Sequence, residues 1–202
     1  MALWYANSLS MAYFSPSYLS SLIVQPLRYY YGNFSTPDLL WDKDPKISTI
    51  EIDTINNFNK IAIQSKPRIL ISRGGYIIKS TGLTNNMVSS SSGRDPGIKS
   101  EKRMLLVEGQ AQILIEAINE GTCEKVLELT QNFITRSAQA IANTQDFKTF
   151  ALPLSVSPCT PSTENTEIFS STIGLPWSKE THWLVEEDGI EFKQFLLTMV
   201  SA

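Results

Sequence analysis

The sequence predicts an α+β fold: a mainly antiparallel β-sheet covered by one or two helices, with an N-terminal helical arm and a long flexible loop. Three observations predict this class. Several segments alternate apolar and polar residues as strands do, two segments repeat their apolar residues at helical spacing, and a stretch rich in Ser, Gly and Asn separates two of the strands. With 202 residues, 42% of them hydrophobic and 18% charged, the chain is long enough to bury a core.

Residues 1–45 are expected to form the helical arm. Ser15 before Pro16 is typical of a helix start, and Gly32 is expected to end the helix. Pro26 removes a backbone donor inside this pattern, so the segment is either kinked or divided into two short helices. Aromatic residues are dense here, and two interpretations stay open: they face a neighbouring subunit, or they cover one side of the sheet.

Residues 46–202 are expected to form the main domain, which begins with strands in 47–54 and 60–74. Gly74 and Gly75, followed by Lys79, raise the question of a phosphate-binding loop. That motif needs a glycine directly before the lysine and a helix after it, and neither is present in the sequence. The two glycines are instead expected to mark a turn or bulge between two strands.

A long loop is expected at about residues 79–102, a length that is usually functional or disordered. The loop and its flanks are cationic and could touch DNA backbone or an acidic partner, but contact with another subunit is the favoured interpretation. The basic residues of this region are Arg73, Lys79, Arg94, Lys99, Lys102 and Arg103.

The next segment is a strand at 104–119 followed by a helix at 120–144. The strand is expected to present Ala111, Ile113, Ile115 and Ala117 on one face. The helix is expected to begin at Thr122 as N-cap and to pack across the sheet, with Cys123 as a small buried residue. Strands are expected again at 147–156, 166–177 and 181–189, and a last one, with a bulge, at 190–200.

No catalytic, cofactor or metal site is predicted. His182 is the only histidine, which excludes a metal centre built from histidines, and Cys123 and Cys159 are too few and too far apart in sequence for a disulfide framework or a metal site. The acidic group at 186–188 has the composition of a solvated turn. The chain has no apolar run long enough to span a membrane and no secretory signal, so we expect a protein made and kept inside a cell.

Several motifs, taken in order, resemble the small neck and tail-completion proteins of tailed bacteriophages, the tail-terminator-like family. These are PRILISRG (Pro67–Gly74), Gly82–Leu83 at the start of the long loop, VEGQAQILIEAIN with the helix behind it, and TIGLPWSKETHWLVEEDG. The resemblance covers roughly residues 45–202.

The resemblance implies a structural virion protein without catalytic residues, assembled in the cytoplasm of a bacterial host. It implies a ring, often hexameric, at the head–tail junction, acting as tail terminator or head–tail connector component. Its partners would be copies of itself, the tail tube and proteins on the portal side, with DNA passing through the lumen without sequence-specific binding. The candidate contact residues are Tyr29, Tyr30, Trp41, Arg73, Lys79, Arg94, Lys99, Trp177 and Trp183.

A second function remains open from the residues alone: a cytoplasmic β-rich module that binds a small ligand. Trp177, His182 and Trp183 would form its shallow pocket, because aromatic side chains with one polar group suit such a site.

Overall fold

The computed structural model describes residues 16–33, 37–55, 66–80, 99–162 and 167–187. The chain divides into two compact units, one made of residues 13–77 and 108–179 and the other of residues 1–12, 78–107 and 180–202. The helical elements are α1 (Pro16–Gly32), the 3-10 turn η1 (Pro37–Leu39) and α2 (Glu120–Gln145). The strands are β1 (Glu51–Thr54), β2 (Arg68–Ser80), β3 (Lys99–Ala117), β4 (Thr149–Phe150), β5 (Ser155–Val156), β6 (Thr160–Pro161) and β7 (Phe169–Glu187).

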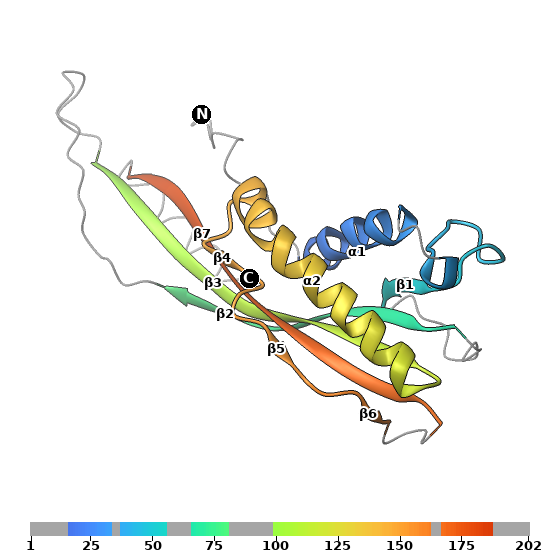
Figure 1. The fold of residues 1–202 in the computed structure, drawn as a ribbon. Helices are drawn as coiled ribbons and strands as arrows, with labels where there is room; N and C mark the ends of the chain where they lie inside the picture. The colour runs from blue at the N-terminus through green and yellow to red at the C-terminus, as the bar shows by residue number, and fades with distance from the viewer. Residues whose placement is uncertain (1–15, 34–36, 56–65, 81–98, 163–166, 188–202) are drawn as a thin grey trace, which may run out of the picture. The chain divides into compact units, whose positions relative to one another are not determined.

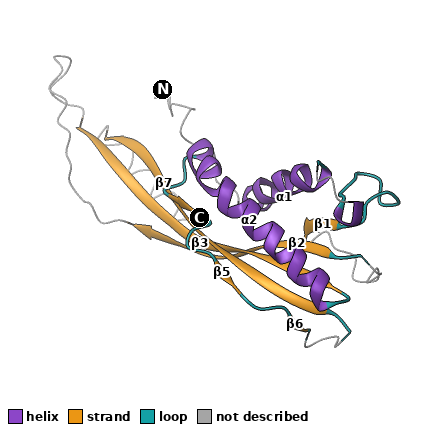
Figure 2. Ribbon diagram, in the orientation of Figure 1, coloured by secondary structure: helices purple, strands orange, loops and turns teal. Residues whose placement is uncertain are grey.

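The strands form one mixed sheet in the order β1-β2-β3-β7-β4, with β5 and β6 also paired to β7. The pairing of β1 with β2 is parallel, and β4, β5 and β6 each pair with β7 in the antiparallel sense. In the larger unit both helices lie on the same face of the sheet (Figures 1 and 2). The predicted fold class, a mainly antiparallel sheet covered by helices, is therefore confirmed.

The core of the larger unit lies between this face and the helices. Along β3 the predicted alternation is confirmed, since Ala111, Ile113, Ile115 and Ala117 are buried while Gln110 and Gln112 are exposed. On β2, Arg68 donates from Nε to a carboxylate oxygen of Glu116 on β3, and both side chains are largely buried. This ion pair joins the two strands where β2 begins.

Helix α2 packs on the sheet through an apolar face with helical spacing, made of Cys123, Val126, Leu127, Thr130, Ile134, Ala138 and Ala142. Its N-cap is Asn119 and not the predicted Thr122. The side-chain oxygen of Asn119 accepts a hydrogen bond from the backbone N–H of Thr122 at 2.7 Å, so Thr122 already lies in the first turn.

Helix α1 ends at Gly32, as predicted. It is continuous through Pro26, so the alternative of two short helices is wrong. It belongs to the same compact unit as β1 and α2. The buried Tyr31 hydroxyl reaches α2, where it lies 2.9 Å from Thr130 Oγ1. Arg28 donates two hydrogen bonds to the carbonyl of Ile52, at 3.0 and 2.8 Å, and so fastens α1 to β1.

The strands reach further into the expected loop than predicted. Strand β2 continues to Ser80 and β3 starts at Lys99, so only residues 81–98 separate them, and these lie outside the described residues. The prediction of a turn at Gly74 and Gly75 is wrong, because β2 continues through both glycines, while the alternative of a bulge stays a prediction. A Cβ at Gly74 would lie 2.2 Å from the carbonyl oxygen of Gln110, so the close approach of β3 explains this glycine.

In the last part of the chain, the predicted strands at 166–177 and 181–189 are one strand, β7, while 190–200 lies outside the described residues. Of the acidic group expected in a turn, Glu186 and Glu187 belong to this strand. None of the helices in the described part of the chain is long and apolar enough to cross a membrane.

Candidate subunit interface

In the described part of the chain, most of β2 in the larger unit has no strand paired to its outer edge. Strand β1 pairs only with Arg68–Ile71, and a further backbone bond from Ile55 to the carbonyl of Ile71 ends the ladder. Within the described residues, no other strand lies on this side of β2 between Ser72 and Ile77. An open strand edge presents unpaired backbone donors and acceptors, which another chain can pair with.

The open edge also carries apolar side chains in contact with solvent. Tyr76 is 46% exposed and Ile77 is 64% exposed, and the cationic Arg73 on the same strand is exposed as well. We call Arg73, Tyr76 and Ile77 the β2 edge. Exposed aromatic and aliphatic residues next to an arginine are the composition that interface centres favour.

The opposite edge of the same sheet differs from the β2 edge in its backbone donors and in its exposed side chains. There β5 and β6 lie along β7, and the exposed apolar residues on this side are Leu152 at 46% and Val156 at 40%. We call this segment, residues 152–161, the β5–β6 edge. It contains Pro153, Pro158 and Pro161, which have no backbone N–H, so this edge offers few donors and would meet a partner mainly through side chains.

The aromatic residues predicted as contacts in the N-terminal region have three different environments. Tyr29 is 76% exposed on α1 and is available to a partner. Tyr30 stacks on Phe133 of α2 with ring centroids 4.7 Å apart. Trp41 is half-buried beneath the guanidinium group of Arg28, which lies 5.2 Å from its ring centroid. Tyr30 and Trp41 thus pack within the unit, whereas the contact of Tyr29 with a neighbouring subunit stays a prediction.

A shallow hollow of about 320 Å³ lies between α1 and α2, on the helical side of the unit. It is lined by Tyr30, Leu129, Asn132, Phe133, Arg136 and Ser137. This position differs from the one expected for a ligand pocket, which would use Trp177.

Trp177 is not on a surface, contrary to the predicted contact role. It is 4% exposed, its ring contacts Phe147 at 6.2 Å between centroids, and a Cβ at Gly109 would lie 2.6 Å from the indole. The indole therefore fills the space left by the missing side chain of Gly109. Because Trp177 is a core residue, it is available neither to a neighbouring subunit nor to a ligand in an open pocket.

The remaining predicted contacts lie in the smaller unit or outside the described residues. Lys79 is exposed near the end of β2. Lys99 lies in β3, and His182 and Trp183 lie in β7, but their side chains are outside the described part, as is all of Arg94.

Two features were missed by reasoning from sequence. The first is the exposure of Tyr76 and Ile77. The run Tyr76-Ile77-Ile78 carried a signal, since three consecutive apolar residues in a strand place at least one on the outer face. The second is that Cys123 and Cys159 are neighbours in the fold, for which the sequence held no signal.

Among the described residues, no three His, Cys, Asp or Glu side chains are grouped as a metal site.

A scan of the chain against protein-family models gives no match, and a search of curated proteins gives none either.

Proposed function

We propose that this protein is a structural virion component, a subunit of a ring at the head–tail junction of a tailed bacteriophage, and that it acts without catalysis. The observation that carries the proposal is the open, apolar β2 edge. Tyr76 and Ile77 are exposed on a long strand of a packed sheet, where a purely monomeric protein would be expected to place charges or a covering element. The sequence resemblance to tail-terminator-like proteins supplies the biological context.

The β2 edge and the β5–β6 edge carry different groups, and this difference supports a head-to-tail contact between copies. The β2 edge offers the exposed side chains of Tyr76 and Ile77 on a strand edge that no described residue pairs with, whereas the β5–β6 edge offers Leu152 and Val156 among prolines. Because the two edges differ, a contact between them is heterologous, and such a contact closes into a ring when the rotation between neighbours divides a full turn. A hexamer is the copy number that the resemblance favours.

The first experiment determines the assembly state of the purified full chain. We expect sedimentation velocity to show a species several times the 22.6 kDa of one chain, and negative-stain images to show closed rings with a central opening. A protein that stays monomeric at all concentrations and whose tryptophan fluorescence is quenched saturably by a small metabolite would reject the ring and favour the ligand-binding module.

The second experiment tests the β2 edge with Ile77→Lys. Full burial of an isoleucine side chain is worth about 1.5–3 kcal/mol. Since Ile77 is 64% exposed in the single chain, its burial at an interface would contribute about 1–2 kcal/mol, and its replacement by lysine should weaken each contact about 5- to 30-fold or more.

Ile47→Lys is the matched control, because Ile47 is 56% exposed but lies before β1, away from the β2 edge. We expect Ile47→Lys to assemble as the wild type does, and both variants to keep the thermal stability of the wild type. Equal assembly by Ile77→Lys and Ile47→Lys would remove the β2 edge from the interface.

A further inference from the structure

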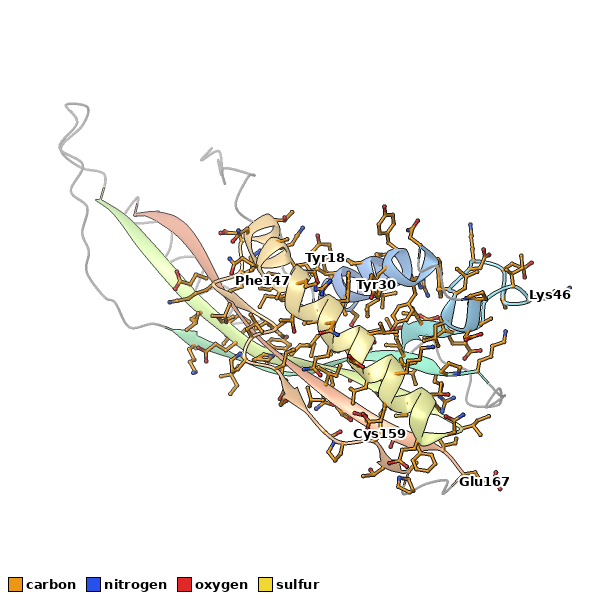
Figure 3. All side chains as sticks on the ribbon, in the orientation of Figure 1. Tyr18, Tyr30, Lys46, Phe147, Cys159 and Glu167 are labelled. Atoms are coloured by element: carbon orange, nitrogen blue, oxygen red, sulfur yellow. The ribbon has the colours of Figure 1, made fainter. Side chains whose placement is uncertain are left out.

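Cys123 and Cys159 are brought together in the larger unit although 35 residues separate them in the chain. Cys123 lies in the first turns of α2 and is fully buried, and Cys159 lies just before β6 and is 7% exposed. Their thiol groups are within hydrogen-bonding reach of each other. Figure 3 shows Cys159 next to the start of α2. Both cysteines are free thiols in this structure.

Each sulfur is held by a well-anchored backbone. Cys123 donates its backbone N–H to the carbonyl of Asn119, the N-cap of α2, at 3.1 Å. On the other side, Ser157 and Ser162 flank Cys159. The backbone N–H of Ser157 donates to the carbonyl of Thr172 in β7 at 2.9 Å, and that of Ser162 donates to the carbonyl of Ile168, just before β7, at 2.7 Å. The two thiols therefore lie within hydrogen-bonding reach of each other on two anchored elements, which is the proximity that a disulfide needs.

A second contact joins α2 to the segment before β6. The backbone N–H of Cys159 donates to a carboxylate oxygen of Glu124 at 3.4 Å, and Glu124 directly follows Cys123 on α2. The segment before β6 thus already touches α2 at two neighbouring positions. A covalent bond at this place would close a loop that contains the rest of α2 together with β4 and β5.

We propose that Cys123 and Cys159 are a redox-active pair that forms an intramolecular disulfide when the protein meets a small-molecule disulfide such as oxidised glutathione. Cys159 is the more exposed thiol and attacks first. Its thiolate bonds to one sulfur of the oxidant and releases one small thiolate. The thiolate of Cys123 then attacks the Cys159 sulfur, forms the protein disulfide and releases the second small thiolate. The two protein S–H protons end on the two released thiols.

Burial raises the pKa of the Cys159 thiol and also that of the Cys123 thiol, and the neighbouring Glu124 adds to both shifts. Few thiolates are therefore present at neutral pH, and the reaction is expected to be slow even where the disulfide is strongly favoured at equilibrium. The pair stays reduced in a reducing compartment and becomes a covalent link between α2 and the β5–β6 edge in an oxidising medium. This chemistry does not require the protein to be a virion component.

The test measures the equilibrium between the dithiol and disulfide forms of the full chain in glutathione redox buffers, once folded and once in urea. Because the folded protein holds the two sulfurs together, we expect the equilibrium constant for disulfide formation to be at least about 30-fold larger in the folded chain, the factor that corresponds to a typical disulfide stabilisation. Intact mass should show the loss of two hydrogen atoms, and a tryptic digest should yield one linked peptide pair containing both cysteines.

Cys123→Ser and Cys159→Ser provide the controls. Each is expected to take up a single glutathione or to remain reduced, without an internal link. Neither should show the rise in Tm that we expect when the wild type is oxidised. An equilibrium constant no larger in the folded than in the unfolded chain, or a folded wild type that yields only glutathione adducts or disulfide-linked dimers, would overturn the proposal.

Discussion

Adjacent glycines in β2 offer a sharp test of the fold, because one touches the neighbouring strand and the other does not. A Cβ at Gly74 would lie 2.2 Å from the carbonyl oxygen of Gln110, about 1.2 Å inside the 3.4 Å at which ordinary contact begins, whereas a Cβ at Gly75 would have nothing within 4 Å. The obstacle at Gly74 is backbone of a central strand and cannot rotate away.

Gly74→Ala must therefore push β2 and β3 apart or twist one of them locally. Overpacking of this kind costs about 1–3 kcal/mol, and a backbone obstacle places the cost near the upper end, at about 2–3 kcal/mol. For a chain of this length the corresponding fall in Tm is about 4–12 °C. Gly75→Ala should change the free energy of unfolding by less than about 1 kcal/mol.

The assay is urea and thermal unfolding of both variants, followed by circular dichroism beside the wild type. Both proteins carry the same added methyl group in the same strand, so differences in expression or in general strand propensity cancel. If Gly74→Ala proved as stable as Gly75→Ala, the close approach of β3 to β2 at this point would be wrong, and a turn at the two glycines would again have to be considered.

Two further predictions concern α2 and its contact with α1. Asn119→Ala should lower the free energy of unfolding by about 1 kcal/mol, because Thr122 loses its capping acceptor, while Asn119→Asp should retain most of it; chemical denaturation measures both. Burial raises the pKa of Tyr31 above its ordinary value of 10. The Tyr31 hydroxyl therefore loses its proton at a lower pH in the unfolded state than in the folded state. The contribution of Tyr31 to the free energy of unfolding is complete below pH 10 and declines above it. Unfolding measured between about pH 9 and 11 should show a steeper decline for the wild type than for Tyr31→Phe, and parallel curves would contradict this.

Periodic segments of the sequence were sufficient to predict the fold class and the main elements. The apolar alternation of β3 and the helical spacing of α2 each involve many residues, so a local error does not change the pattern. Boundaries were less certain because they depend on single contacts. Asn119 and Thr122 are both good N-caps, and only the hydrogen bond between them decides which one caps the helix.

The candidate site was harder to predict because it depends on which strands become neighbours. Tryptophan is common in exposed binding sites, which is why Trp177 was predicted as a contact residue. Its indole is instead buried, because Gly109 has no side chain and leaves room for it in the core. Cys123 and Cys159 come together because, after α2, the chain runs beside β7 as β4, β5 and β6, and Cys159 lies between β5 and β6. Neither relation leaves a trace in local sequence, since each joins residues more than 30 positions apart.

The prolines of the β5–β6 edge have a consequence for how growth of an assembly is limited. An edge with a full set of backbone donors accepts almost any extended peptide, including misaligned copies of itself, and so invites fibrillar stacking. Pro153, Pro158 and Pro161 at this edge of the sheet lack the backbone N–H groups that strand pairing uses, so in the proposed assembly a neighbour would have to fit the side chains of Leu152 and Val156. The β2 edge would thus pair with many extended chains, whereas the β5–β6 edge would bind only a neighbour with matching side chains. This difference between the two edges suits a particle in which the number of copies is fixed.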